Sequence, residues 1–128
     1  MYLEPKFLYN YRPTSASEPG EDFIIPFGKA KIRRPGTDIS IVSYGNAIHI
    51  SLRAAEELAK EGISCEVIDL RSLAPWDKKT VFESVKKTSR AVVAHEHYLT
   101  GGLGGEIAAS ISNELFRYLD APVARVAS

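Results

Sequence analysis

Residues 94–109 read AHEHYLTGGLGGEIAA and contain the residue types whose spacing could do chemistry. His95 and His97 are two positions apart, so on a strand they share one face while Glu96 points to the other. Two imidazoles on one face could hold a metal ion, and His95, at the carboxyl end of a parallel strand, could act as a general acid or base. A third metal ligand would have to come from elsewhere. The pattern therefore favours a histidine and a glutamate that hydrogen-bond to the following loop.

The glycines of the same stretch do not form a dinucleotide-binding loop. Gly102 and Gly104 supply the first two positions of GxGxxG, but Ile107 occupies the third. Backbone amides that open a helix could still bind an anion, either a phosphate or a carboxylate from a partner chain. The interpretation that the sequence favours is a glycine turn, including Gly101, that lets the helix pack close to the sheet.

Two further positions carry residue types that could organise a site. Asp69 and Arg71 lie on the same face of a predicted strand near its carboxyl end, so they could form an ion pair that orders the next loop. Trp76 stands just outside a predicted helix start, where it is either a staple onto the domain or a contact for another subunit. The candidates for an interface or loop role are Trp76, His95, Glu96, Gly101, Gly102 and Gly104.

The composition indicates a single globular domain and argues against several classes of partner. The chain has 128 residues, of which 45% are hydrophobic and 25% charged. Its 16 basic and 16 acidic residues cancel, so it lacks the charge footprint for nucleic acid or an anionic membrane. The single cysteine, Cys65, excludes an internal disulfide and suits a reducing compartment. No apolar run approaches the ~18 residues of a membrane span. We expect a cytoplasmic protein without nucleic-acid or membrane partners.

The elements that must position these residues follow from the hydrophobic pattern. It predicts strands over 28–34, 38–45, 65–71, 91–96 and 122–126, and helices over 47–61, 78–88 and 103–115. Asp77 is placed to cap the second helix, and Gly62 follows the first helix where a left-handed C-cap belongs. Alternating strands and helices with short connections predict a mainly parallel sheet covered on both sides. The first strand reaches the second through a tight turn and is expected to run antiparallel.

The N-terminal residues differ in composition from the rest of the chain. Aromatic residues continue as far as Tyr11 and are followed by a Pro-, Ser- and Glu-containing stretch that is typical of a linker. An aromatic arm of this kind has nothing of its own to pack on. We expect residues 1–22 to be an arm and linker from a preceding domain, and residues 23–128 to form the α/β domain.

Five segments, taken together and in order, make the chain resemble one family. They are ISCEVIDLRSLAPWD (63–77), IPFGKA (25–30), KKTSRAVVAHE (86–96), LTGGLGGEIAA (99–109) and LDAPVARV (119–126). The chain resembles the C-terminal domain of the β subunit of thiamine-diphosphate-dependent 2-oxoacid dehydrogenases, the first and decarboxylating component (E1) of those complexes. This domain is of the transketolase C-terminal type.

Within that family the chain is most similar to the branched-chain, or 2-oxoisovalerate, type. The similarity rests on EPKFLY (4–9), SCEVIDLR (64–71), PWD (75–77) and the pair His95-Glu96 followed by LTGG. The chain departs from the family at two places. Asn10-Tyr11 separates Leu8-Tyr9 from the arginine that usually follows directly, and Phe27 replaces a more usual leucine.

The resemblance implies a three-layer α/β/α fold whose mixed five-stranded sheet has its first strand antiparallel. It implies a parent heterotetramer that oxidatively decarboxylates a branched-chain 2-oxoacid and transfers the acyl group to the lipoyl group of the acyltransferase, E2. In the family, thiamine diphosphate binds the β subunit's preceding domain and the α subunit, and the α subunit holds the magnesium. The resemblance therefore assigns no catalytic, cofactor-binding or metal-binding residue to this chain.

The resemblance also implies the partners of the domain: the α subunit or α region, a second β subunit, and E2, which it helps to dock. Alone it would be inactive. Members of the family continue beyond the final strand, so the domain is expected to be truncated at its C-terminal end. Two alternatives stay open. One is the equivalent domain of a transketolase or deoxyxylulose-phosphate synthase, against which EVIDLRSLAPWD argues; the other is a free-standing anion-binding module.

Overall fold

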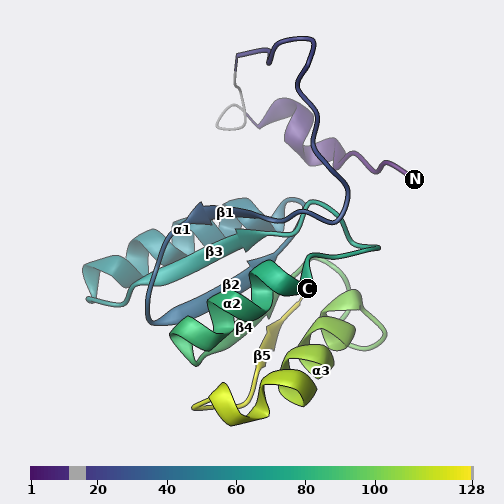
Figure 1. Cartoon of the computed structure of the whole chain (residues 1–128). Helices are drawn as coiled ribbons and strands as arrows, with labels where there is room; N and C mark the ends of the chain where they lie inside the picture. The colour runs from purple at the N-terminus through teal and green to yellow at the C-terminus, as the bar shows by residue number, and fades with distance from the viewer. Residues whose placement is uncertain (12–16, 128) are drawn as a thin grey trace.

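The computed structural model describes residues 1–11 and 17–127, and these build a five-stranded sheet between two layers of helices (Figure 1). The elements are β1 (Lys31–Arg34), β2 (Ile39–Ser43), α1 (Ala47–Lys60), β3 (Cys65–Asp69), α2 (Lys78–Thr88), β4 (Ala91–Ala94), α3 (Leu103–Leu115) and β5 (Ala124–Val126). The described residues also include two short 3-10 helices, Lys6–Asn10 and Phe116–Tyr118. Helix α1 covers one face of the sheet, and α2 and α3 cover the other. The expected α/β/α fold is confirmed.

The strand order is β1-β3-β2-β4-β5, and every pair is parallel except β1 with β3. The first strand is antiparallel, as expected, but its neighbour is β3 rather than the strand that follows it in the chain. After β1 the chain crosses the end of β3, and Gly36 lies so close to the backbone of Cys65 and Glu66 that a Cβ atom there would overlap with it. Amides of Thr37 and Asp38 both donate to the carbonyl of Ser64.

Helix α1 buries the apolar face that its sequence pattern predicts. The core on this side of the sheet consists of Ile41, Ile48, Ala55, Cys65 and Val67. Gly62 has φ of +83° directly after the helix, in the left-handed region expected of its C-cap. Burial raises the pKa of the Cys65 thiol, which keeps it protonated and unreactive.

The larger core lies between the sheet and the helices α2 and α3. Its buried members come from α2, from α3, from the strands β2, β3 and β4, and from Leu70 directly after β3. They include Val42, Ile68, Val81, Val85, Val93, Ile107, Ile111 and Leu115. Asp77 begins α2 as predicted, since its Oδ1 accepts a hydrogen bond from the Thr80 amide at 3.1 Å. The hydroxyl of Ser40 bridges the hydroxyls of Ser84 and Thr88 at 2.6 and 2.7 Å, which joins β2 to α2.

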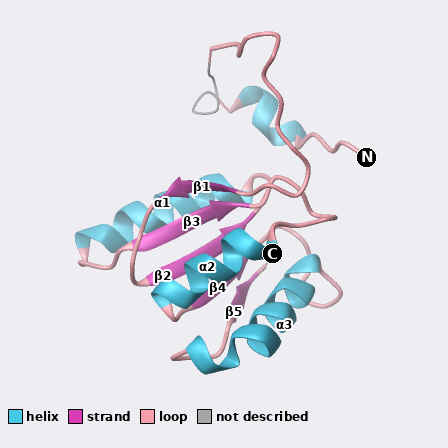
Figure 2. Ribbon diagram, in the orientation of Figure 1, coloured by secondary structure: helices cyan, strands magenta, loops and turns pink. Residues whose placement is uncertain are grey.

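The loops that follow β2, β3 and β4 gather at one edge of the sheet, and the N-terminal arm lies above that edge (Figure 2). The arm touches the domain through Tyr11, whose ring meets the imidazole of His49 edge-on at 5.2 Å between centroids. None of the helices in the described residues is long and apolar enough to cross a bilayer.

Candidate functional site

The imidazole of His95 lies inside the domain rather than on its surface. Its side chain is only 4% exposed and stacks on the ring of Tyr44, at 6.0 Å between centroids and an interplanar angle of 5°. Nδ1 accepts a hydrogen bond from the backbone amide of His97 at 3.2 Å. Nε2 has no hydrogen-bond partner among the described residues. The bond to the following loop agrees with the interpretation that the sequence favoured for this histidine.

The glycines of the loop make room for this imidazole. A Cβ atom on Gly104, in the first turn of α3, would overlap with Nε2 and Cδ2 of His95. A Cβ atom on Gly102 would lie 2.9 Å from Cε1 of the same ring, and Gly101 turns the chain with φ of +76°. The close packing expected of the glycine turn is therefore present, and the atoms that it brings together are those of α3 and His95.

Burial lowers the pKa of His95, and the positive charges of His97 and Arg125 lower it further. The neutral form with Nδ1 as acceptor carries its proton on Nε2, which faces the backbone of Gly104. His95 has no free path to a reacting group, so its geometry suits packing better than acid or base catalysis.

Glu96 points away from His95 and connects two loops. Its Oε1 accepts a hydrogen bond of 2.7 Å from Nδ2 of Asn46, the residue before α1. The partner in this bond lies in the loop after β2. Within the described residues, no group of three or more His, Cys, Asp and Glu side chains is placed to hold a metal ion.

The ion pair predicted between Asp69 and Arg71 does not form. Asp69 pairs instead with Arg33 of β1, at 3.5 Å. Strand β3 ends at Asp69, and Arg71 follows it with φ of +56°, so the strand periodicity that placed the two side chains on one face no longer applies. Arg71 donates from Nε to the carbonyl of Lys29 at 3.1 Å and from Nη2 to the carbonyl of Ala30 at 3.2 Å.

Trp76 is half-buried and belongs to the domain's own packing. Its ring meets Phe82 of α2 edge-on at 6.0 Å between centroids, and the Lys78 ammonium lies 5.5 Å above it. Of the two roles considered for this residue, the contacts fit the staple onto the domain.

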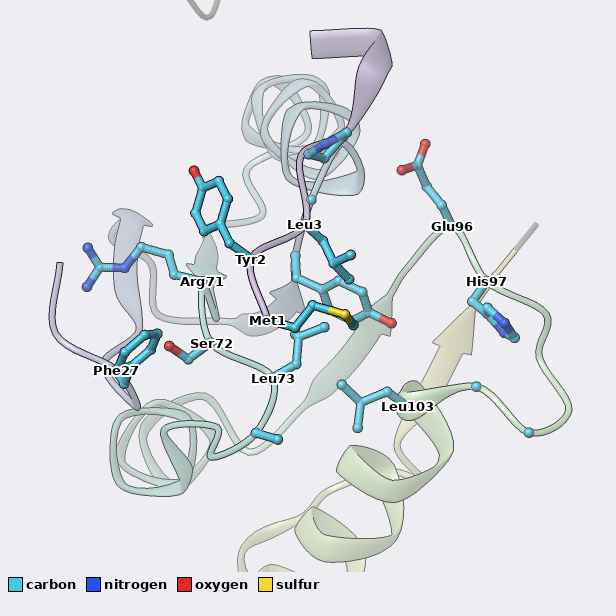
Figure 3. A pocket seen from close by; sticks show the side chains of 16 residues that line it. Met1, Tyr2, Leu3, Phe27, Arg71, Ser72, Leu73, Glu96, His97 and Leu103 are labelled. Carbon is cyan, nitrogen blue, oxygen red and sulfur yellow. The ribbon is translucent and has the colours of Figure 1, made fainter. Parts of the chain in front are cut away.

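A pocket of about 790 Å³ opens at the carboxyl ends of β2, β3 and β4. Figure 3 shows Arg71 at one end, between Tyr2 and Phe27, and Glu96 and His97 at the other. Apolar side chains lie between the two ends, among them Leu73 and Leu103. A doubly wound sheet has its ligand-binding crevice at this position, where consecutive crossovers run in opposite directions.

The comparisons with known proteins agree with this topology. The model of the family "Transketolase, C-terminal domain" matches residues 28–128. The chain belongs to this family.

Curated members of the family with similar sequences are β subunits of 2-oxoacid dehydrogenases. The 2-oxoisovalerate dehydrogenase subunit beta 2 of Arabidopsis thaliana is 45% identical over 98% of this chain and 35% of its own length. The pyruvate dehydrogenase E1 component subunit beta of Bacillus subtilis is 45% identical over 92% of this chain and 36% of its own length. A solved structure described as a split gene transketolase, inactive beta4 tetramer, has a TM-score of 0.70 and 33% identity over 84% of this chain and 34% of that chain. The chain spans about a third of the length of these relatives.

In this transketolase C-terminal domain, only some of the residues predicted for an interface or loop role line the pocket. Glu96, Gly101 and Gly102 line it, whereas His95, Gly104 and Trp76 do not. Arg71, Leu73, Leu103 and Tyr44 also line the pocket, although the sequence pattern did not predict a pocket role for them. One signal could have found them, since each lies at or shortly after the carboxyl end of a predicted parallel strand or begins the helix after it.

Proposed function

We propose that this chain is the C-terminal domain of the β subunit of a 2-oxoacid dehydrogenase first component. The parent enzyme would oxidatively decarboxylate a branched-chain 2-oxoacid and pass the acyl group to a lipoyl arm. The observation that carries the proposal is the identity of 43–47% with β subunits of this class over nearly the whole chain. Relatives of the pyruvate and the branched-chain type are similarly identical, so the choice of acid rests on the motifs SCEVIDLR and PWD.

Within the parent enzyme we assign the domain to assembly rather than to chemistry. Large apolar side chains stand exposed close to the strand-end edge: Phe27 is 88% exposed, and Tyr98 in the loop after β4 is 74% exposed. Leu99 in the same loop is 44% exposed. Exposed apolar groups that lie together favour burial by a partner protein. They support contacts with the α subunit, a second β subunit and the acyltransferase.

The cofactor expected of the parent enzyme is thiamine diphosphate with magnesium, and the described residues offer no convergent set of ligands for the magnesium. Magnesium in such sites needs convergent oxygen ligands, and the described carboxylates do not converge with other potential ligands in groups of three or more. We therefore derive no step through the cofactor here. In the proposal it is held by other parts of the parent enzyme.

The test is to recover the native assembly from source cells with an antibody against this domain. The recovered enzyme, supplied with thiamine diphosphate, magnesium and a lipoyl domain, should turn over 2-oxoisovalerate faster than pyruvate. A faster reaction with pyruvate would overturn the branched-chain assignment. Turnover of sugar phosphates without 2-oxoacid dehydrogenase activity would favour the transketolase alternative. The similarity to the split gene transketolase structure is the reason to test it.

The 128-residue chain alone serves as the matched control in the same assay. Because the proposal places the cofactor in other parts of the parent enzyme, we expect no turnover of any of these substrates. Turnover by the chain alone at the rate of the recovered assembly would contradict the assembly role. A blot with the same antibody gives the length of the native polypeptide, which should approach three times that of this chain.

A further inference from the structure

The pocket at the strand-end edge has the volume and position of a small-molecule site. Its volume of about 790 Å³ falls within the range of pockets that hold cofactors and metabolites. Its walls come from the loops after three neighbouring parallel strands and from the start of α3, and Phe27 and the first residues of the N-terminal arm complete them. Of the exposed side chains that support the assembly role, Tyr98 and Leu99 do not line it, and Phe27 does.

Arg71 provides a fixed positive charge at one end of this pocket. Two of its donors, on Nε and Nη2, are held by the carbonyls of Lys29 and Ala30, which fixes the plane of the guanidinium. A guanidinium has five N–H donors, so the fork formed by Nη1 and the second Nη2 proton stays available. Among the described residues, no carboxylate lies within ion-pair distance of Arg71.

The backbone of Arg71 gives a second reason to regard its placement as specific. Its φ of +56° is in the left-handed region, which a residue with a long side chain seldom adopts and which costs about 1–2 kcal/mol. Strained residues of this kind concentrate at binding sites, where the surrounding structure holds them. The available fork of the guanidinium matches a carboxylate, which it binds with two parallel hydrogen bonds.

The rest of the pocket determines what the carboxylate would be attached to. The middle is apolar. Leu73, Leu103 and the ring of Tyr44, which pack against the main core, line it together with Met1 and Leu3 of the N-terminal arm (Figure 3). Glu96 lies at the far end from Arg71 (Figure 3), where its charge repels a second anion. A ligand therefore directs its carboxylate to Arg71 and its apolar body to the middle of the pocket.

We propose that this pocket binds a small aliphatic carboxylate, held by the Arg71 guanidinium at one end and by apolar side chains along its length. The site shares only Phe27 with the side chains assigned to assembly, and the proposal does not depend on the parent enzyme's substrate. Neither an anion without an apolar body nor an apolar molecule without a charge satisfies both halves of it.

The experiment is a titration of the isotope-labelled 128-residue chain, followed by the amide resonances in NMR spectra. Isocaproate is the probe, isocaproamide is its neutral counterpart of similar shape, and inorganic phosphate is an anion without an apolar body. Isocaproate should give saturable shifts at Ser72, Leu73 and Gly102, with a dissociation constant of about 1 mM or lower. Isocaproamide and phosphate should each bind at least about tenfold more weakly.

Two variants test the role of the guanidinium. Arg71→Gln should weaken isocaproate binding by about tenfold or more, and Arg71→Lys should also weaken it, because lysine keeps the charge but lacks the fork. Arg33→Gln is the matched control, since Arg33 is a nearby arginine that pairs with Asp69 and does not line the pocket. It should bind isocaproate as the original chain does.

The proposal is overturned if isocaproate produces no saturable shift up to about 10 mM. It is also overturned if the amide or phosphate binds as tightly, or if the shifts map away from the pocket. Equal binding by a folded Arg71→Gln variant would exclude the guanidinium as the anchor. If that variant does not fold, the comparison of isocaproate with isocaproamide and phosphate on the unaltered chain decides the question.

Discussion

The imidazole of His95 and the backbone of Gly104 fill their shared space so closely that a further carbon atom has no room. We predict that Gly104→Ala destabilises the domain by about 1–3 kcal/mol, because overpacking a core costs this much and exceeds the helix propensity gained from alanine. The change is measured from the midpoint of urea unfolding. Gly105→Ala is the matched control, since its Cβ would lie 3.3 Å from the flexible end of Arg125. It should be neutral or slightly stabilising.

A double variant separates the specific overlap from a general effect of alanine at this position. His95→Ala removes the ring that Gly104→Ala would strike, so the double variant should lose less stability than the sum of the two single changes. Additive losses would show that the imidazole is not what requires glycine here.

The lowered pKa of His95 predicts a dependence of stability on pH. The unfolded chain has an ordinary histidine pKa of about 6.5, whereas burial and the charges of His97 and Arg125 hold the folded pKa of His95 below that value. Between these two pKa values the unfolded state binds more protons, so stability rises with pH in this window and falls as the pH drops from about 7 toward 5. Urea unfolding at several pH values measures this slope.

The variant His95→Gln should reduce that slope without removing it. Burial also lowers the pKa of His49, so this second histidine contributes in the same direction. His49→Gln should reduce the slope separately. An unchanged slope in the His95→Gln variant would show that this imidazole titrates as an exposed histidine does.

At the scale of elements, Asp77 connects α2 to the segment before β1. Its carboxylate accepts from the Thr80 amide and hydroxyl at 3.1 and 2.8 Å, and from the Ala30 amide at 3.0 Å. Burial acts to raise the pKa of this carboxyl, but these hydrogen bonds outweigh it and lower the pKa. The charged form is therefore the one that the fold stabilises.

We predict that Asp77→Ala lowers the free energy of unfolding by about 2 kcal/mol, because it removes a helix cap and leaves the Ala30 amide without its acceptor. Denaturation with urea near neutral pH gives the value. Asp120→Ala is the control: Asp120 forms an exposed ion pair with Arg90 at 3.6 Å, so its removal should cost less than about 1 kcal/mol. Equal losses in the two variants would contradict the bridging role of Asp77.

The helices could be predicted closely from the sequence, and their caps explain why. Asp77 and Gly62 act through bonds or backbone conformations within a few residues, so the local pattern contains the information. The partner of β1 could not be predicted, because pairing with β3 depends on where the chain crosses after Gly36. The burial of Glu66 could not be predicted either, because its Oε2 pairs with Nζ of Lys87 at 2.5 Å and Lys87 is distant in the sequence.

The candidate site shows the same division between local and long-range information. The hydrogen bond from the His97 amide to His95 was foreseeable, because the two residues are neighbours in the chain. The partners of Glu96 and Arg71 come from the loop after β2 and the segment before β1, and strand periodicity contains no information about either. The position of the pocket follows from the strand order, which is a property of the assembled sheet.

At the scale of the whole molecule, the exposed apolar side chains of the loop after β4 predict self-association. Tyr98 and Leu99 stand 74% and 44% exposed beside the strand-end pocket. Exposed apolar side chains that lie together favour burial against another protein surface. We predict that the 128-residue chain associates with itself in a concentration-dependent way, as measured by sedimentation velocity.

The double variant Tyr98→Ser/Leu99→Ser should raise the dissociation constant of this association by about tenfold or more, because exposed aromatic side chains are frequent anchors of interfaces. Phe116→Ser is the matched control, since Phe116 is 78% exposed but follows the far end of α3, away from the loop (Figure 1). It should leave the association unchanged. A chain that stays monomeric at every concentration, or a Phe116 variant that dissociates equally, would place the interface elsewhere.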